Sequence, residues 1–267
     1  MENSNNFVSV AIPTYNSSMY LKNCLDSLLN VKIIDEIIIS DDYSNDSEFK
    51  KIKIIINNLK TTKRIKIYRN EKNLGAFINK YENIKKCKNE IVYQIDSDNI
   101  AGNNLSTVLN SIIKDKNLDL LYLPSKIYQF RKYKNIARIF SLFNDKYKVT
   151  FTNDDFVFNK EIIKQSIKNE IKSTVDKNIN WVLNSGNFIV HRSKFLKAME
   201  GPINTNIRYP LDAVAISYYW VEGGGNIKTL KEFEHFHRKR PDSVSFVENE
   251  GSYDSLVSFR NKFLELN

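Results

Sequence analysis

Short apolar segments alternate with segments of helical periodicity over the first hundred residues. The apolar segments have the length and β-branched content of buried strands, and they lie at residues 7–12, 36–40, 64–68 and 90–95. Between them, apolar residues recur at helical spacing at residues 19–29, 49–59 and 77–87. This alternation predicts an α/β fold, in which a parallel sheet carries helices on its faces.

The pattern becomes irregular after residue 98. Further helices are expected at residues 105–113, 160–172, 193–199, 211–221 and 253–266. Further strands are expected at residues 118–123, 187–191 and 227–230. Residues 125–177 are rich in Lys, Asn and aromatics and contain no repeating βα unit. The chain therefore reads as one domain with an elaborated second half.

Polar segments follow three of the predicted parallel strands, at residues 13–16, 41–46 and 96–98. Ligands of open α/β sheets bind beyond the carboxyl ends of the strands, so these segments are expected to share one site. Each also has a simpler interpretation. Asn16 or Ser17, and Ser44 or Asp46, are suitable helix caps, and the Asp96-Ser97-Asp98 segment could be a solvated turn.

Asp96 and Asp98 occupy alternate positions, so both carboxylates could face one hard cation such as Mg²⁺ or Mn²⁺. Asp42, after the second strand, could accept a hydrogen bond from a base N–H or a ribose hydroxyl. The chain has no glycine-rich phosphate loop. A metal is therefore the expected partner for a diphosphate.

The composition narrows the class of protein without identifying it. Apolar residues make up 42% of the 267 residues, enough for a sizeable core, and no segment has the length of a membrane span. The polar N-terminus does not resemble a signal peptide, and Cys24 and Cys87 are expected to be buried free thiols, which favours a cytoplasmic location. The net charge of +9 suits an anionic partner, although the general abundance of Lys, Asn and Ile, as a biased genome would produce, explains the total better, and no nucleic-acid-binding motif is present.

Four motifs in order resemble glycosyltransferase family 2. They are VSVAIPTYN at residues 8–16, ISDDYSND at 39–46, NLG at 73–75 and DSDN at 96–99. The resemblance implies the GT-A fold, a Rossmann-like, mostly parallel sheet flanked by helices with an elaborated C-terminal acceptor half. It also implies a nucleotide-sugar-binding half at residues 1–100, an acceptor-binding and catalytic half at 101–247 and a C-terminal helix at 248–267.

The resemblance assigns roles in the first half of the chain. Asp42 accepts from the base, usually uracil, Asp96 lies near the ribose, and Asp98 ligates a divalent metal, Mn²⁺ or Mg²⁺. The residues expected to contact the nucleotide are Pro13, Thr14, Tyr15, Asp42, Gly75, Lys80 and Asp96. Lys80 stands where the family often has Arg, and a point charge does not replace a bidentate fork.

In relatives, a pair of acidic residues begins the helix expected here at residues 211–221, and the second acid is the catalytic base. Asp212 matches that second acid, whereas Leu211 replaces the first. Asp212 could instead be only a helix cap after Pro210. Asn187 lies in a strand that resembles the one flanking donor and acceptor. The segment at residues 236–245 resembles a late loop that closes over the diphosphate, in which His237, rather than His235, is expected to join the metal. Arg238 and Arg240 are suited to phosphate.

These assignments imply an inverting glycosyltransferase that moves a sugar from a nucleotide-diphosphate donor, expected to be a UDP-sugar. The expected acceptor is a saccharide or lipid-linked saccharide in bacterial surface polysaccharide or lipopolysaccharide synthesis. The protein could then contact the inner face of the cell membrane peripherally. The alternatives are a non-catalytic sugar-nucleotide or polysaccharide-binding relic and a sugar-phosphate nucleotidyltransferase. Some of the aromatic residues in 125–177 could line an acceptor groove or touch a membrane, or simply pack: Tyr128, Phe130, Tyr133 and Phe140.

Overall fold

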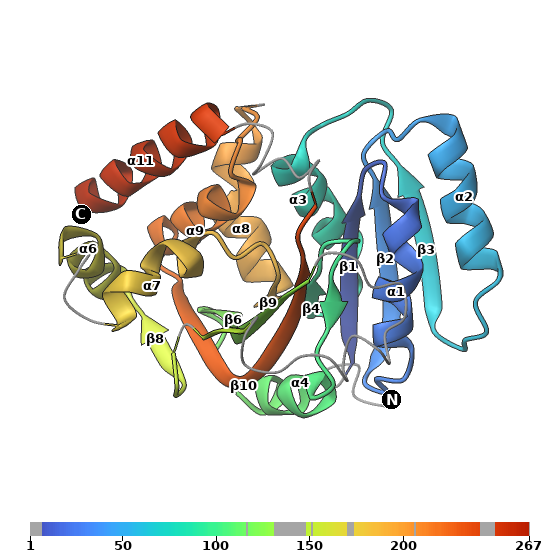
Figure 1. Ribbon diagram of the computed structural model, residues 1–267, viewed down its shortest axis with the longest axis horizontal. Helices are drawn as coiled ribbons and strands as arrows, with labels where there is room; N and C mark the ends of the chain where they lie inside the picture. Colours follow the sequence, from blue (N-terminus) through green and yellow to red (C-terminus); the bar gives the residue numbers. More distant parts are fainter. Residues whose placement is uncertain are drawn as a thin grey trace.

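The computed structural model describes residues 7–115, 117–130, 148–150, 152–169, 174–205, 207–240 and 249–266. Within these residues one sheet has the strand order β3-β2-β1-β4-β9-β6-β10-β5, with β7 paired to β6 and β8 paired to β10. Helices cover both faces of this sheet (Figure 1). The sheet contains strands from both halves of the chain, so residues from both halves can meet at the ends of its strands.

The first half is a βα series, as the apolar pattern predicts. Its strands are β1 (Val8–Thr14), β2 (Ile34–Asp41), β3 (Arg64–Arg69) and β4 (Ile91–Gln94). Its helices are α1 (Ser18–Leu29), α2 (Asp46–Asn57) and α3 (Ala76–Lys86). Neighbouring strands in this half pair in parallel. The polar segments that follow β1, β2 and β4 therefore meet at one edge of the sheet.

The second half mixes parallel and antiparallel pairs. Its strands are β5 (Ile100–Ala101), β6 (Leu120–Phe130), β7 (Lys148–Thr150), β8 (Phe156–Phe158), β9 (Phe188–His191) and β10 (Asn226–Arg238). Its helices are α4 (Leu105–Lys114), α6 (Lys160–Asn169), α7 (Thr174–Leu183), α8 (Arg192–Ile203), α9 (Asp212–Glu222) and α11 (Asn249–Glu265).

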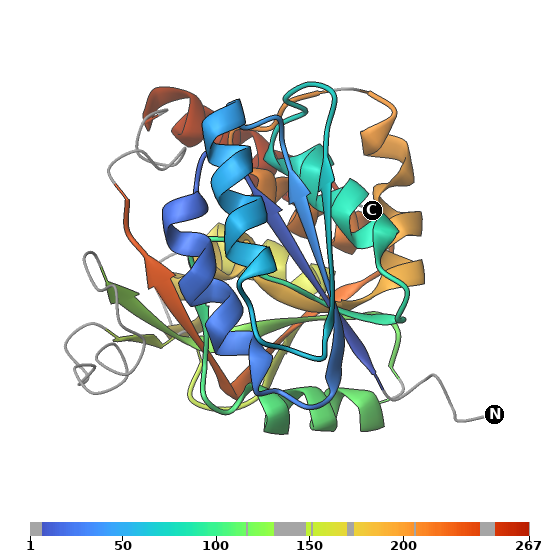
Figure 2. The same cartoon turned by 90° about the vertical axis from the view of Figure 1, so that its right-hand side faces the viewer.

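Side-chain alternation along β1 explains the two cores. Val8, Val10 and Ile12 pack with residues of α1, α2 and α4 on one face, whereas Ala11 faces the core beneath α3, α8 and α9. Figure 2 shows the blue helices α1 and α2 on one side of β1–β3, and the teal α3 with the orange α8 on the other. A strand buried on both faces reads as a continuous apolar run, which is why the sequence pattern is strong here.

Two strands are longer than their apolar patterns predict. The segment expected to end at residue 123 continues in β6 to Phe130, and the one expected to end at 230 continues in β10 to Arg238. The two strands pair in parallel from Asn226↔Leu120 to Arg238↔Phe130, with an irregularity between Leu230 and Glu234. Tertiary pairing extends them through polar residues that carry no strand pattern of their own.

This extension corrects the prediction of a loop starting at residue 236. Phe236 to Arg238 belong to β10, and residues 241–248 lie outside the described part of the chain. Helix α7 was also not expected, since its first residues fall in a span without clear periodicity. The prediction of free, buried thiols at Cys24 and Cys87 is confirmed.

Four aromatic residues in 125–177 were considered for an acceptor groove or a membrane contact, and the two that the structure describes pack against other side chains. Tyr128 stacks on Phe236, with ring centroids 5.0 Å apart, and Phe130 is 4% exposed. Tyr133 and Phe140 lie outside the described residues. None of the helices in the described ranges is long and apolar enough to cross a membrane.

Candidate active site

A cavity of about 730 Å³ opens at the carboxyl ends of β1, β2 and β4. Its wall includes every site residue predicted from the sequence: Pro13, Thr14, Tyr15, Asp42, Gly75, Lys80, Asp96, Asp98, Asn187, Asp212, His237, Arg238 and Arg240. These residues are up to 227 positions apart in sequence (Arg240 − Pro13), so the fold brings them together. Their individual roles remain predictions.

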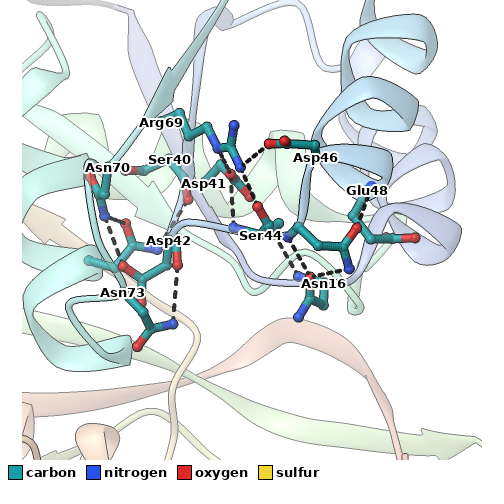
Figure 3. Close-up of polar contacts among 12 residues, drawn as sticks. Asn16, Ser40, Asp41, Asp42, Ser44, Asp46, Glu48, Arg69, Asn70 and Asn73 are labelled. Atoms are coloured by element: carbon teal, nitrogen blue, oxygen red, sulfur yellow. Dashed lines mark hydrogen bonds and ion pairs between the residues drawn. The ribbon is translucent and has the colours of Figure 1, made fainter.

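Asp42 lies at one end of the cavity, almost fully buried and bonded to the chain itself (Figure 3). One carboxylate oxygen accepts from Asn70 Nδ2 at 2.9 Å and from the Leu74 amide at 2.8 Å. The other accepts from the Gly75 amide at 2.9 Å. A carboxylate offers about four acceptor positions, so one further donor, such as a base N–H, can still be accommodated.

Gly75 is held by Asp42 in a backbone conformation that other residues rarely adopt. Its φ angle is +87°, and a Cβ added there would lie 3.5 Å from the Arg208 side chain. A side chain at this position would therefore be strained by the backbone whatever the space available. The turn and its carboxylate form one preorganised unit.

Asp41, next to Asp42, has a structural role. It accepts from the Ser44 amide at 3.2 Å and lies 3.4 Å from Arg69, which also pairs with Asp46 at 2.9 Å (Figure 3). Burial raises the pKa of Asp41. The cap of α2 is Asn45, whose side chain accepts from the Glu48 amide, so the capping roles considered for Ser44 and Asp46 are wrong.

Ser17 occupies the cap position of α1 but makes no capping bond. Its hydroxyl instead bonds Thr14 Oγ1 at 2.8 Å and Ser97 Oγ at 2.7 Å. This hydroxyl chain ties the loop after β1 to the Asp96-Ser97-Asp98 turn. Sequence reasoning missed Ser17 as a link, since a serine before a helix is usually read as a cap.

Asn187 holds the same turn from β9. Its Oδ1 accepts from the Asp96 amide at 2.7 Å, and its Nδ2 donates to Asp96 Oδ2 at 3.4 Å. Asn99 completes the tie to β10, because its Oδ1 accepts from the Arg238 amide at 2.9 Å. The Asp96–Asp98 segment is therefore an anchored turn rather than a loose solvated one.

Asp98 lies beside both arginines of the predicted phosphate segment. Arg240 Nε is 3.2 Å from its Oδ2, and Arg238 Nε donates to its backbone oxygen at 3.0 Å. Arg238 also lies over the rings of Tyr20 and Phe130, 4.5 and 4.4 Å from their centroids. Burial raises the pKa of Asp98 to about 6, although Arg240 acts in the opposite direction.

Lys80 is buried between two carboxylates. Its Nζ is 2.7 Å from Asp212 Oδ2 and 3.0 Å from Asp96 Oδ1, and it donates to the Gly186 oxygen at 3.3 Å. Gln94 Nε2 donates to Asp96 Oδ1 at 3.1 Å and to the same Gly186 oxygen at 3.0 Å. Gln94 was missed by sequence reasoning, and its only signal is an amide inside an otherwise apolar strand.

His235 and His237 point to the same face of β10, as alternate residues of a strand do. His235 is fully buried, and His237 is partly exposed. Burial lowers the pKa of both histidines, so both imidazoles are neutral near pH 7. A neutral imidazole is the form that binds metal.

The donor atoms fit a divalent cation that shares its ligands with a diphosphate. Asp96, Asp98 and His237 line one cavity with oxygen and imidazole donors. Within the described ranges, no group of three or more His, Cys, Asp or Glu side chains converges as a complete protein site. Mg²⁺-type sites commonly use one or two carboxylates and complete the shell with substrate phosphates.

The cavity lies beyond the carboxyl ends of parallel strands, which is the usual place of a ligand site in an α/β fold. The sequence profile described as Glycosyl transferase family 2 matches residues 9–156, more than half of the chain. The chain therefore belongs to glycosyl transferase family 2, and the resemblance stated from its motifs is confirmed.

Curated relatives match parts of the chain. Glycosyltransferase GlyG of Streptococcus pneumoniae is 24% identical over 245 residues, which are 90% of this chain and 73% of that protein. The uncharacterized glycosyltransferase MG060 of Mycoplasma genitalium is 29% identical over 117 residues, 43% of this chain and 39% of that protein. The chondroitin synthase of Pasteurella multocida is 29% identical over 121 residues, 45% of this chain but only 12% of that protein.

Solved structures share the fold. S. aureus TarS 1-349 in complex with UDP-GlcNAc has a TM-score of 0.61 at 16% identity, covering 97% of this chain and 70% of that one. GalNAc-T7 with UDP, GalNAc and Mn²⁺ has a TM-score of 0.57 at 15% identity, covering 96% of this chain and 48% of that one. The predicted GT-A fold is therefore confirmed.

Proposed function

We propose that the protein is an inverting, metal-dependent glycosyltransferase that uses a nucleotide-diphosphate sugar, with a UDP-sugar as the expected donor. The observation that carries this proposal is the single cavity in which Asp42, Asp98 and Asp212 are arranged with Arg238 and Arg240. A base-binding acid, a metal-binding acid and a proton-accepting acid are the groups that such a transfer needs. The ligands named for TarS and GalNAc-T7 support the choice of UDP and of a divalent cation.

In this mechanism the donor binds with its base at Asp42 and the loop of Pro13, Thr14 and Tyr15. Its ribose lies near Asp96. Arg238 and Arg240 face the diphosphate, and Asp98 with His237 would hold Mn²⁺ or Mg²⁺. A metal held there would supply positive charge for the departing diphosphate.

Asp212 is the proposed general base at the start of α9. It takes the proton of an acceptor hydroxyl while that oxygen forms a bond to the anomeric carbon. The bond from the anomeric carbon to the diphosphate oxygen breaks, and the nucleoside diphosphate leaves with the electron pair. Attack from the face opposite the leaving group inverts the anomeric configuration.

The acceptor is proposed to be a saccharide, free or lipid-linked, in polysaccharide synthesis. Trp181 in α7 is 44% exposed and lines the cavity from the second half of the chain. Gln129 and Asn184 line the same wall and offer amide groups. An indole face beside amides suits a sugar ring, which has apolar C–H faces and hydroxyl edges. The relationship to chondroitin synthase supports a polysaccharide product.

A direct test combines donor turnover with product stereochemistry. The protein is incubated with Mn²⁺ and a panel of UDP-, GDP- and dTDP-sugars, and free nucleotide release is measured with and without saccharide acceptors. We expect release from a UDP-sugar that increases with acceptor, and NMR of the product should show an inverted anomeric centre. Binding of UDP-sugars without any turnover would favour the non-catalytic relic instead.

A further inference from the structure

Lys80 is a buried charged side chain in the wall of the cavity. It extends from α3, is 4% exposed, and contacts acceptors from three other segments: Asp96, Gly186 and Asp212. An unpaired buried ammonium is strongly unfavourable, so these contacts determine whether the charge can be kept. Burial alone lowers the pKa of Lys80, but Asp212 and Asp96 more than offset it and raise the pKa above the usual range.

We propose that Lys80 is a positioning residue that orients the carboxylate of Asp212 for proton abstraction and ties it to the carboxylate of Asp96 on the donor side. This inference rests on the proposed function, in which Asp212 is the base. This positioning role takes the place of the nucleotide contact that the motif position implies for Lys80. Asp212 is 22% exposed on its side chain, so one part of the carboxylate contacts the ammonium while another part is open to the cavity.

Two neighbours, Gly186 and Gln94, help to fix the position of the Lys80 ammonium. A Cβ at Gly186 would lie 3.0 Å from Lys80 Nζ and 3.2 Å from Asp96 Oδ2, so glycine leaves the room that the ion pairs occupy. Gln94 binds the same two acceptors as Lys80, namely Asp96 Oδ1 and the Gly186 oxygen. The ammonium is therefore constrained on the side away from Asp212, and its position defines where Asp212 is held.

The shared ammonium gives the functional consequence. Asp96 and Asp212 both contact Lys80 Nζ, at 3.0 and 2.7 Å, so removal of the ammonium leaves two neighbouring carboxylates without their common partner. Asp212 then loses the contact that fixes its orientation, while its place at the start of α9 is unchanged. A loss of turnover without a loss of donor affinity is therefore expected.

The test replaces Lys80 by methionine, which has similar length but no charge, and by arginine, which keeps the charge. Lys86→Met is the matched control, because Lys86 lies on the same helix, where it pairs with Glu82 at 3.5 Å, donates to the Glu82 backbone oxygen at 3.2 Å and lies over the Tyr68 ring. We expect Lys80→Met to lower kcat on the order of 10²-fold, as misplacement of a catalytic group does.

Two further measurements separate positioning from other roles. UDP affinity with Mn²⁺, measured by calorimetry, should be nearly unchanged in Lys80→Met, and Lys80→Arg, which keeps the charge, should recover much of the wild-type kcat. In a double-mutant cycle with Asp212→Asn, Lys80→Met should cause little additional loss of kcat, because the group it positions is already disabled. If Lys80→Met does not fold, Lys80→Gln carries the same expectations.

Additive losses in the cycle would overturn the proposal, and so would a wild-type kcat in Lys80→Met. If Lys80→Met loses UDP affinity but keeps its kcat at saturating donor, Lys80 contacts the nucleotide instead. That result would also overturn the proposal. These results concern Lys80 alone, provided that the wild type turns over a donor. A wild type that neither binds UDP nor cleaves a UDP-sugar refutes the proposed function, and the role of Lys80 with it.

Discussion

The two ends of the cavity hold their carboxylates by different means. At the Asp42 end, the acid accepts hydrogen bonds from two backbone amides and an asparagine, all within 2.9 Å. At the Asp98 and Asp212 end, the acids contact the charged side chains of Arg240 and Lys80. Backbone amides are fixed by the fold, whereas cationic side chains can be exchanged for another cation or for substrate.

This difference matches what each end is proposed to do. Recognition of a base needs an acceptor that is already in place, and preorganisation lowers the cost of binding. Binding of a metal and a diphosphate needs charge that can be rearranged. The contact between Asp98 and Arg240 must open if Asp98 binds a metal and Arg240 binds phosphate.

The largest effect is expected from Asp98→Ala. It removes the proposed metal ligand and should abolish metal-dependent transfer, measured as nucleotide release with saturating Mn²⁺. Asp26→Ala, which breaks an exposed pair with Lys22 on α1, is the control and should retain activity. Activity that persists after complete chelation of divalent metals would contradict the metal assignment at this end of the cavity.

Asp212→Asn should lower turnover by about 10²–10⁴, the usual contribution of a general base. The substitution keeps the shape of the side chain, so donor affinity measured by calorimetry should change little. Near-normal turnover would mean that the base lies elsewhere and that Asp212 serves as an N-terminal helix residue only. Rates at several pH values distinguish a lost base from a slow product release.

Asp42→Asn tests the end held by backbone amides. An asparagine places an NH₂ group where the carboxylate now accepts from an amide, and loss of charge-assisted hydrogen bonds should destabilise the fold by about 1–3 kcal/mol. UDP affinity should fall by roughly 10-fold or more on the same grounds. Thermal unfolding and calorimetry measure the two effects. A variant as stable as wild type would show that the carboxylate does not organise the turn.

Trp181→Ala addresses the proposed acceptor wall and should have the smallest effect. Loss of the exposed indole should raise the KM for a saccharide acceptor by about 5-fold, since aromatic contacts contribute on the order of 1 kcal/mol beyond buried area. The donor KM and acceptor-independent donor hydrolysis should stay at wild-type values. Trp220, the other tryptophan, is fully buried, so the fluorescence of Trp181 can report acceptor binding directly. An unchanged acceptor KM would place the acceptor elsewhere.

The first half of the fold could be predicted in detail because its signals are local. Strands β1, β2 and β4 are buried and apolar over most of their length, and each is followed by a polar motif, whereas the edge strand β3 alternates polar and apolar residues. The second half was predicted less well, since β6 and β10 continue as strands through residues such as Lys126 and Glu234, which face partners found only in three dimensions. Pairing between strands that are far apart in the chain does not require a periodic pattern of apolar residues, so the local sequence does not indicate it.

Apolar periodicity and short motifs depend on neighbouring positions, so the family, the βα order and the residue types at the strand ends could be predicted from the sequence. Which charged groups meet depends on the folded chain. The tertiary structure joined Lys80 to Asp96 and Asp212, Arg240 to Asp98, and Asp42 to the amides after Asn73. Ion pairs and hydrogen bonds act over a few ångströms between residues far apart in the chain, so the spacing of residues along the sequence does not reveal them.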